Sequence, residues 1–562
     1  MDYIFDKFED EIKKGVRRVF DLDIDIPIEI PDEERGDYAI PCFVFSKLLK
    51  KSPHEIAEII TNNIELELGS AQSSGPYVNF KIDDRELVKN TIEKCLEYED
   101  SFGSYPSKDE KMILEHTSAN PNGPLHVGRA RNPIIGDTLA RVYEKMGYDV
   151  ERQYFVNDIG RQMAIFAWGS INIEERDLPE PERNKIDYRM VRYYQKANSQ
   201  LEEEPKIEDE VRDIIHAMEK GDKQTLNLFK DNADKVLKGV TDSLKRLNIT
   251  LDSFKNESDF VVDGSVDDIV DQMDKNKRCG KEDGALFFEK DEKRTFLTRA
   301  DGTNLYPARD LAYHKWKAER AGRLLNILGE DHKLHGHFLK DALESIDITP
   351  VPDFVFYSFV SFEGEEMSTR KGKYVTLDDL MDTAHNKAKK EILKRRDDFS
   401  SDEIERISEQ VGIGAIRFNI IKIQPEKPID FRWEEALNFR GDTAPFIQYT
   451  YARSCGILER SDIDLDPDQV DMSKIDEPGE MKLIKTMAKF PHILKTVRDN
   501  NVPHRLAKYA LELASEFNQF YRDHPVIQSK NKKTERLLLV KAYSYVLKSL
   551  LDTLGLEAPE SM

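Results

Sequence analysis

The chain has 562 residues, more than one hydrophobic core can organise, so its length predicts about three to four domains. With 39% hydrophobic and 34% charged residues and no run of about 18 apolar residues, it is typical of a soluble globular protein without a membrane span. The four cysteines lie far apart with no CxxC pair, which argues against a disulfide framework and a cysteine zinc site. The amphipathic, acidic start is unlike a signal peptide, so we expect a cytoplasmic protein.

The net charge of −23 is unexpected for a nucleic-acid-binding protein, because phosphate affinity comes from Lys and Arg. The charge is unevenly distributed, however. Between 481 and 550 there are 14 Lys/Arg and 5 Asp/Glu, a local charge of +9 inside an otherwise acidic chain. Such a segment fits contact with a nucleic acid, and it fits a solvated helical face equally well.

The first predicted unit covers residues 1–105 and mixes strands with helices. IPIEIP (26–31) and YVNFKI (77–82) have the residue types of strands, and PHEIAEIITNNI predicts a helix that begins at Pro53. SFGSYPSKDE (101–110) is rich in turn formers and predicts a linker. The sequence therefore predicts a small α+β domain at the N-terminus.

A βαβ pattern follows the linker. KMILEH (111–116) predicts a buried strand, a Pro/Gly/Asn-rich turn comes next, and a helix is predicted from Leu125 to Gly147 before a second strand, DVERQYFV (149–156). A charged, mostly helical stretch at about 165–295 is predicted to be an insertion. The strands RLLNILGE (323–330) and PDFVFYSFVSF (352–362) would complete a parallel sheet, and from 401 onward the apolar spacing is helical.

The turn between the first strand and helix carries the most specific motif, HTSANPNGPLHVGR (116–129). A loop that enters a helix presents free N–H groups and the positive end of the helix dipole to phosphates. In the first turn His126 can donate a hydrogen bond to a phosphate, and Gly128 leaves room for a nucleoside against the backbone. PLHVGR resembles the HIGH motif of class I aminoacyl-tRNA synthetases, and the extended SANPNGPLHVGR resembles the arginyl enzymes in particular.

This resemblance implies ATP contacts from Ser118, Asn120, His126 and Gly128, with Mg²⁺ carried by ATP. The family usually has His at the last motif position, where this chain has Arg129. Arginine can still contact phosphate, and its charge does not titrate. We therefore expect Arg129 to act beside His126 in catalysis.

The segment EEMSTRKGKYVTLDDL (365–380) resembles the family's KMSKS loop, although Glu366 and Thr369 replace its two lysines. The chemistry is attack of a carboxylate on the α-phosphorus, so positioning and charge stabilisation dominate catalysis. The candidates for stabilising pyrophosphate are Arg370 and Lys371, and the ATP contacts implied by the motif are Met367 and Ser368. The alternative is a basic surface turn.

Recognition of arginine needs a carboxylate that faces the guanidinium with two parallel hydrogen bonds. Tyr306 and Asp310 lie four residues apart, on one helical face, in a segment that resembles the family's substrate-binding segment. The alternative for Asp310 is that it only complements a helix N-terminus. The resemblance also implies arginine contacts from Asn120, Tyr154 and His332. The histidines at 332, 335 and 337 have no Cys or carboxylate at the spacing of a zinc site, so we expect no protein-bound zinc.

Both ends of the chain resemble tRNA-contacting domains of the arginyl family. In the helical C-terminal third, aromatic and basic residues are interleaved, and the candidates for tRNA contact are Tyr449, Arg453, Phe520 and Arg522. Rings can stack on unpaired bases, but rings on helices are as often core residues. The N-terminal unit resembles the family's additional domain, which is associated with the D-loop corner of tRNA, and could instead be a packing module.

Together these features imply an α/β Rossmann-type class I catalytic domain at 106–400, a small α+β N-terminal domain and an all-α anticodon-binding domain at 401–562. The family reaction converts L-arginine and ATP to arginyl-adenylate, then transfers arginine to the terminal adenosine 2′-OH of tRNA(Arg), releasing AMP and pyrophosphate. We expect a monomer. One alternative is another class I synthetase, such as a cysteinyl or glutamyl enzyme. A second is a synthetase-like RNA-binding protein that has lost catalysis, as the altered Arg129, Glu366 and Thr369 would suggest.

Overall fold

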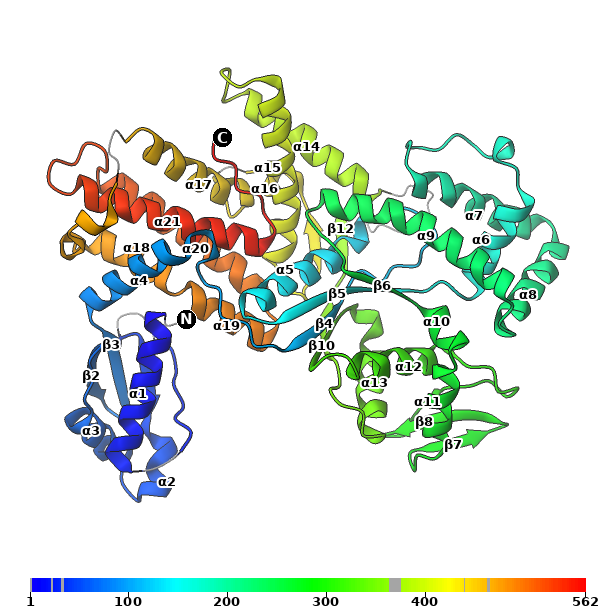
Figure 1. Cartoon of the computed structure of the whole chain (residues 1–562), viewed down its shortest axis with the longest axis horizontal. Coiled ribbons are helices and arrows are strands. Elements are labelled where there is room, and N and C mark those ends of the chain that lie inside the picture. The colour runs from blue at the N-terminus through cyan, green and yellow to red at the C-terminus, as the bar shows by residue number, and fades with distance from the viewer. Residues whose placement is uncertain (1–2, 22–23, 32–34, 363–374, 439, 462–464) are drawn as a thin grey trace.

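The computed structural model describes residues 3–21, 24–31, 35–362, 375–438, 440–461 and 465–562. A parallel sheet lies at the centre, with the N-terminal unit and the C-terminal helices toward one end and two insertions toward the other (Figure 1). Among the described residues, no helix combines the length and apolar character needed to cross a bilayer.

The N-terminal unit packs helices on a small antiparallel sheet of order β1-β3-β2. The strands are β1 (Tyr38–Pro41), β2 (Gly69–Ser74) and β3 (Tyr77–Ile82), and the helices are α1 (Ile4–Phe20), the short η2 (Cys42–Phe45) and α2 (Ser46–Leu49), and α3 (Pro53–Asn63). The strand expected at 26–31 is reduced to one bridge, between Glu29 and Ala39. Pro27 and Pro31 lack the N–H groups that a longer ladder would need.

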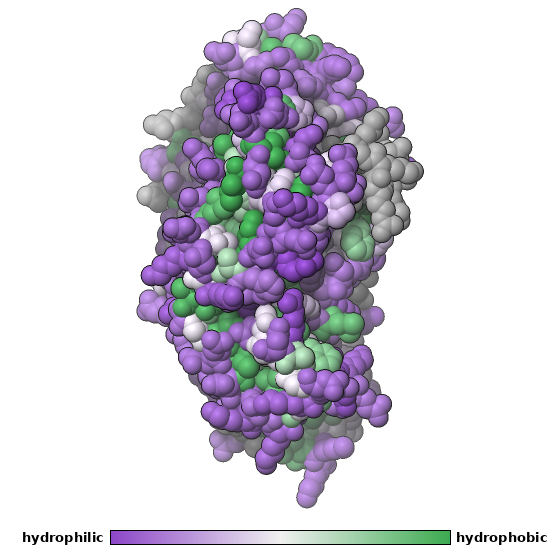
Figure 2. Space-filling model, turned by 90° about the vertical axis from the view of Figure 1, so that its right-hand side faces the viewer, coloured by the Kyte–Doolittle hydropathy of each residue, from purple (hydrophilic) through white to green (hydrophobic). Residues whose placement is uncertain are grey.

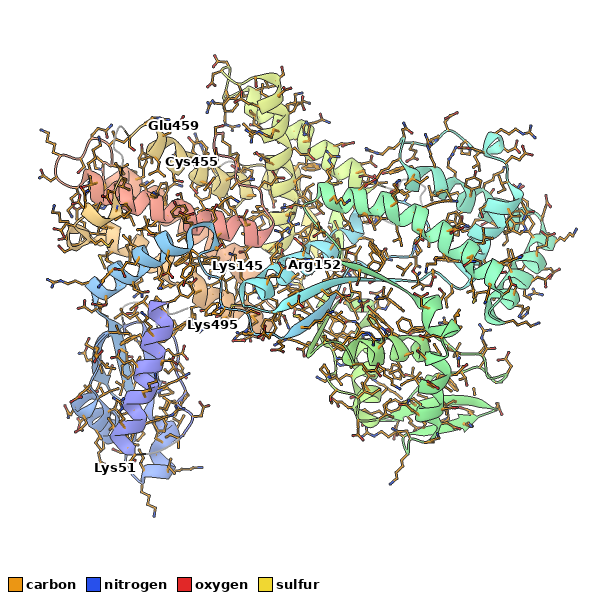
Figure 3. All side chains as sticks on the ribbon, in the orientation of Figure 1. Lys51, Lys145, Arg152, Cys455, Glu459 and Lys495 are labelled. Carbon is orange, nitrogen blue, oxygen red and sulfur yellow. The ribbon has the colours of Figure 1, made fainter. Side chains whose placement is uncertain are left out.

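Helix α4 (Asp84–Tyr98), followed by η3 (Glu99–Ser101), packs against the C-terminal helices α18 (Pro478–Ala488) and α21 (Lys533–Leu554). Asp83 caps α4 by accepting hydrogen bonds from two backbone N–H groups. Lys495, labelled in Figure 3, also pairs with Asp6 at 2.6 Å, and Lys485 pairs with the buried Asp37 at 2.6 Å. The N-terminal unit is therefore attached to the last part of the chain as well as to the linker.

The central sheet has the order β11-β10-β4-β5-β6, with every pair parallel. Its strands are β4 (Lys111–Glu115), β5 (Asp149–Val156), β6 (Ser253–Asn256), β10 (Arg323–Gly329) and β11 (Asp353–Tyr357). From β4 the chain first builds the side of β5 and β6, then crosses to build β10 and β11. The strand order therefore reverses between β4 and β10, and in such sheets ligands bind beyond the carboxyl ends of the strands at that point.

The stretch expected to be one insertion is two insertions separated by β6. The first is helical: α6 (Arg161–Asn172), η5 (Glu175–Asp177), α7 (Ile186–Glu203), α8 (Pro205–Glu219) and α9 (Lys223–Arg246). The second contains α10 (Glu257–Val262), α11 (Ser265–Asp274) and an antiparallel sheet of β7 (Cys279–Glu282), β8 (Ala285–Lys290) and β9 (Lys293–Phe296). The face at this end of the molecule is mainly hydrophilic, with scattered apolar groups (Figure 2).

Helix α12 (Tyr306–Ala318) leads into β10, and the short η6 (Glu330–His332) and α13 (Lys333–Ser345) connect β10 to β11. The strand expected at 352–362 is two strands, because the chain bends at Ser358, whose N–H donates to Pro425 O at 2.8 Å. The second strand, β12 (Val360–Phe362), pairs with β13 (Ile429–Phe431) in a separate sheet.

The described C-terminal part is otherwise helical. Its elements are α14 (Leu377–Leu393), α15 (Ser401–Ile421), α16 (Trp433–Ala436), α17 (Ala444–Glu459), η8 (Pro467–Gln469), η9 (Met472–Lys474), α18, α19 (Phe490–Asn500), α20 (His504–Asp523) and α21.

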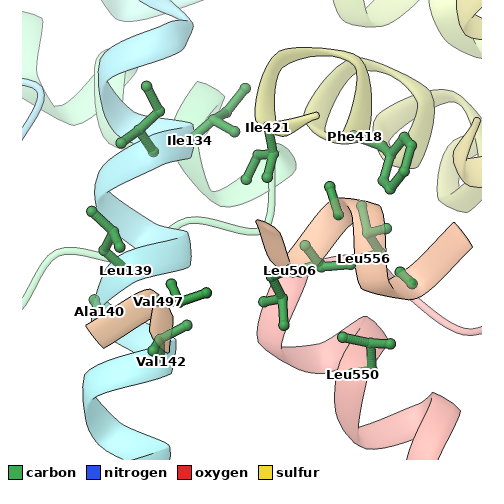
Figure 4. Close-up of a cluster of buried hydrophobic side chains, with 14 of the residues drawn as sticks. Ile134, Leu139, Ala140, Val142, Phe418, Ile421, Val497, Leu506, Leu550 and Leu556 are labelled. Carbon is green, nitrogen blue, oxygen red and sulfur yellow. The ribbon is translucent and has the colours of Figure 1, made fainter. Parts of the chain in front are cut away.

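Helix α5 (Arg131–Lys145), which follows η4 (Val127–Arg129), packs directly into these helices. Figure 4 shows Ile134 and Leu139 of α5 in one apolar cluster with residues of α15, α19, α20 and α21. Inside this interface, the fully buried Arg417 and Asp137 form an ion pair of 2.6 Å. The helix that follows the first sequence motif is thus held in place by the C-terminal domain.

Candidate active site

His126 lies beyond the carboxyl end of β4, as the N-terminal cap of η4. Its Nδ1 accepts a hydrogen bond from the Gly128 N–H at 3.0 Å, so a neutral ring carries its proton on Nε2. Burial, and secondly the charge of Arg129, lower the pKa of His126, which keeps the ring neutral at pH 7. A Cβ at position 128 would lie 3.1 Å from that Nδ1, so a glycine there also leaves room for the imidazole.

The chain returns from the second motif directly onto the first. Val127 N donates to Val375 O at 3.1 Å and Leu377 N to Leu125 O at 2.8 Å, so His126 and Thr376 form a bridge. The second-motif candidates themselves lie outside the described residues: Glu366, Met367, Ser368, Thr369, Arg370 and Lys371. Their position in the sequence, immediately before Val375–Leu377, connects them to the His126 loop.

A cavity of about 590 Å³ opens beside this junction. On one side it is lined by Asn120, His126, Arg129 and Thr376, and on the other by helix α7. Two of the lining residues are hydrogen-bonded to each other, with Asn120 Nδ2 donating to Gln162 Oε1 at 2.9 Å. The first motif and the described end of the second, at Thr376, therefore line the same cavity.

The predicted arginine-binding acid, Asp310, lies in the second turn of α12. His335 Nε2 is 2.6 Å from one carboxylate oxygen, and His314 Nδ1 is 3.0 Å from the other. Burial alone would raise the pKa of Asp310, but the contacts with His314 and His335 outweigh it and hold the pKa well below its usual range. Tyr306, one turn earlier, is 55% exposed, and its ring centroid lies 4.9 Å from that of His335.

A chain of buried polar side chains connects Asp310 to the His126 loop. From His314 Nε2 it passes to Asn326 of β10 at 2.9 Å, and from Asn326 Nδ2 to Glu115 at the end of β4, again at 2.9 Å. Glu115 also accepts from Lys317 Nζ at 2.8 Å and from the Ser118 hydroxyl at 3.1 Å. Asp310 and the loop therefore lie at the same end of the sheet, on either side of the switch between β4 and β10.

Two of the predicted site residues, Ser118 and Tyr154, stabilise the 117–120 turn through hydrogen bonds. Ser118 Oγ accepts from Phe155 N at 3.1 Å, so its hydroxyl bonds within the protein on both sides. Tyr154 is fully buried, and its hydroxyl donates to Ala119 O at 2.7 Å. Both hold the 117–120 turn against the end of β5.

Two further residues near Asp310, His335 and Glu257, are not identified by the sequence motifs. His335 makes the contact with Asp310, whereas the predicted His332 is exposed and lies 3.7 Å from Asp331. Glu257, buried at the start of α10, forms an ion pair with Arg309. Burial raises the pKa of Glu257, and nearby Asp310 adds to that shift.

The tRNA-contact candidates divide by exposure. Tyr449 is 39% exposed and Arg453 lies over its ring at 4.7 Å, while the Arg522 side chain is 70% exposed. Phe520 is only 1% exposed and packs beside Phe517 in the core of the helical domain. Stacking of a base on Phe520 is therefore wrong as a prediction, because the ring faces the interior.

Among the described residues, only Glu477, Glu480 and His524 have the geometry of a metal site. Arg536 Nε already donates to Glu480 at 2.8 Å, and Lys532 Nζ lies 3.0 Å from Glu477. The two cations supply the positive charge that this acidic cluster needs, so it is explained as an ion-pair network.

Comparisons with known proteins agree with this arrangement. Residues 91–433 match the family "tRNA synthetases class I (R), catalytic domain", residues 447–562 the "DALR anticodon binding domain" and residues 6–82 the "Arginyl tRNA synthetase N terminal domain". The arginine–tRNA ligase of Methanocella arvoryzae is 42% identical over 527 residues, 92% of each chain, and that of Methanothermobacter thermautotrophicus 39% identical over 100% of each.

Two solved structures are similar over nearly the whole chain. The arginyl-tRNA synthetase of Thermus thermophilus has a TM-score of 0.85 at 25% identity and covers 99% of both chains. That of Plasmodium falciparum has a TM-score of 0.83 at 19% identity over 100% of both, which supports the fold.

Proposed function

Because the chain belongs to the class I arginyl-tRNA synthetase family and is an arginine–tRNA ligase, we propose that the cleft between His126 and Asp310 performs both steps of that reaction. The family and fold class expected from the sequence are thereby confirmed. The roles of individual residues, the use of Mg²⁺, a monomeric state and a cytoplasmic location are proposals.

In the activation step, the protein positions ATP and stabilises charge. His126 Nε2–H donates to a phosphate, and Arg129 in the same cavity adds a permanent positive charge. Arg370 and Lys371 stabilise the departing pyrophosphate, and Met367, Ser368, Asn120 and Gly128 contact ATP. Mg²⁺ carried by ATP would neutralise part of the phosphate charge. The carboxylate of arginine then attacks the α-phosphorus.

Arginine is selected by its guanidinium. Asp310 remains ionised and offers two oxygens, each oriented by a histidine, to the two parallel N–H groups of the substrate. Tyr306 forms a wall beside them, Glu257 supplies a second buried acid, and Asn120 and His332 contact the rest of the amino acid. Tyr154 contributes by supporting the turn that carries Asn120.

The tRNA is held by the two ends of the chain. On the helical domain Tyr449, Arg453 and Arg522 form the exposed part of the contact, with the ring of Tyr449 available for stacking. The N-terminal unit contacts a second region of the tRNA. The terminal adenosine reaches the same cleft, where its 2′-hydroxyl accepts the arginyl group.

The observation that supports this proposal is the chain of polar contacts from Asp310 through His314, Asn326 and Glu115 to Ser118, because it connects Asp310 to the His126 loop at one end of the sheet. The test is ATP–pyrophosphate exchange with arginine, with and without tRNA(Arg). We expect exchange that depends on arginine. Exchange only with another amino acid would indicate a different class I synthetase, and no exchange with any amino acid would indicate a protein that has lost catalysis. Lys371→Ala should lower the exchange rate, and an unchanged rate would refute the loop assignment.

A further inference from the structure

Helix α7 of the first insertion contacts the point where the two nucleotide motifs meet. The Tyr188 hydroxyl lies 2.7 Å from Thr376 Oγ1 and 3.1 Å from Asp378 Oδ2. All three residues are buried, with Tyr188 at 3% exposure. A hydrogen bond in such an enclosed place is not readily replaced by water.

Thr376 connects Tyr188 to His126. Its hydroxyl caps α14 in a capping box with Asp379, and its backbone forms the bridge with His126. Thr376 therefore lies between the Tyr188 hydroxyl and His126, the residue to which we assign a contact with ATP. A change in the position of Thr376 shifts part of the cavity wall beside His126, because Thr376 lines the cavity there.

Ion pairs hold the insertion against the first turns of α14. Lys185 lies 2.9 Å from Asp378, and Arg183 binds Asp382 at 2.6 Å. Arg246 of α9 binds the second oxygen of Asp382 at 2.5 Å. In these three pairs the cations come from the insertion and the acids from α14, so opposite charges hold the insertion against that helix.

We propose that Tyr188 is a positioning residue for the ATP-dependent step, and that the helical insertion acts through it to hold Thr376 beside His126. This inference rests on the proposed function of the cleft. The described side-chain partners of Asp310 are His314 of α12 and His335 of α13, and α7 contributes none of them. Replacing Tyr188 should therefore raise the KM for ATP and leave the KM for arginine unchanged.

The test compares Tyr188→Phe with Tyr193→Phe in the exchange assay. Tyr193 lies on the same helix with its ring partly buried, and among the described residues nothing hydrogen-bonds its hydroxyl. Loss of one buried neutral hydrogen bond should raise the KM for ATP about three- to tenfold in Tyr188→Phe. The KM for arginine should stay unchanged, and Tyr193→Phe should match the unaltered protein.

A double-mutant cycle separates positioning from simple packing. Thr376→Val removes the Tyr188–Thr376 hydrogen bond from the other side, together with the cap of α14, while Tyr188→Phe also removes the contact with Asp378. Because the two variants share one hydrogen bond, their combined effect on the KM for ATP should be smaller than the sum of the two single effects. Additive effects, equal rises in both KM values, or a normal KM for ATP in Tyr188→Phe would each overturn the inference. If the unaltered protein shows no exchange at all, the proposed function fails instead.

Discussion

Replacement of Asp310 by Asn tests arginine recognition directly. The carboxylate side chain is 20% exposed and contacts two imidazoles, so water has little room to replace a missing charge. The amide also places an N–H group toward one of the two histidines. For a charge-assisted pair that loses one partner we expect a loss of about 2–3 kcal/mol. That corresponds to a fall of about 30- to 160-fold in kcat/KM for arginine.

The assay is exchange at saturating ATP with arginine varied in the presence of tRNA(Arg), followed by the converse experiment with ATP varied. The kcat/KM for arginine should fall when arginine is varied, and the KM for ATP should stay near its original value when ATP is varied. Asp341→Asn is a matched control, because Asp341 lies on α13 and pairs with Lys290 of the second insertion. An unchanged kcat/KM for arginine in Asp310→Asn would refute the assignment of Asp310.

Four other outcomes follow from contacts elsewhere in the protein. The fully buried His116 has its pKa lowered by burial to about 4, so between that value and its ordinary 6.5 the unfolded chain binds the extra proton. Stability should thus fall by up to about 3 kcal/mol as pH drops through this window, and His116→Asn should flatten that slope in urea unfolding. Asp137→Asn leaves Arg417 buried without its carboxylate and should cost about 3–5 kcal/mol, so an unchanged thermal midpoint would contradict the ion pair's importance. Tyr449→Ala should weaken tRNA binding by about 1–3 kcal/mol at fixed salt. Phe520→Leu should lower the thermal midpoint without a comparable loss of tRNA affinity.

The sequence predicts best the elements with strong local patterns. The helix at 53–63 begins at a proline after a serine cap, and the strand at 149–156 has its expected bounds. Strand β6 was missed because its four residues, Ser253–Asn256, include only one apolar side chain. What makes it a strand is its pairing with β5, which local sequence cannot show.

The site shows the same division. The motif around His126 and the i, i+4 pair of Tyr306 and Asp310 can be predicted because their spacing is local. The partners of Asp310 are His314, one turn further along α12, and His335 of α13, and only folding selects His335 over His332. The burial of Phe520 is likewise decided by the packing of helices and not by the ring itself.

Helix α4 has a consequence for how the protein is made. Its apolar side, with Leu87, Val88 and Ile92, is covered by α18 and α21, which are encoded after the whole catalytic domain. On a ribosome, α4 emerges long before those partners exist, so this surface stays uncovered through most of translation. A chain that stops before α18 is thus expected to be prone to aggregation and to require a chaperone, even with its N-terminal sheet already formed.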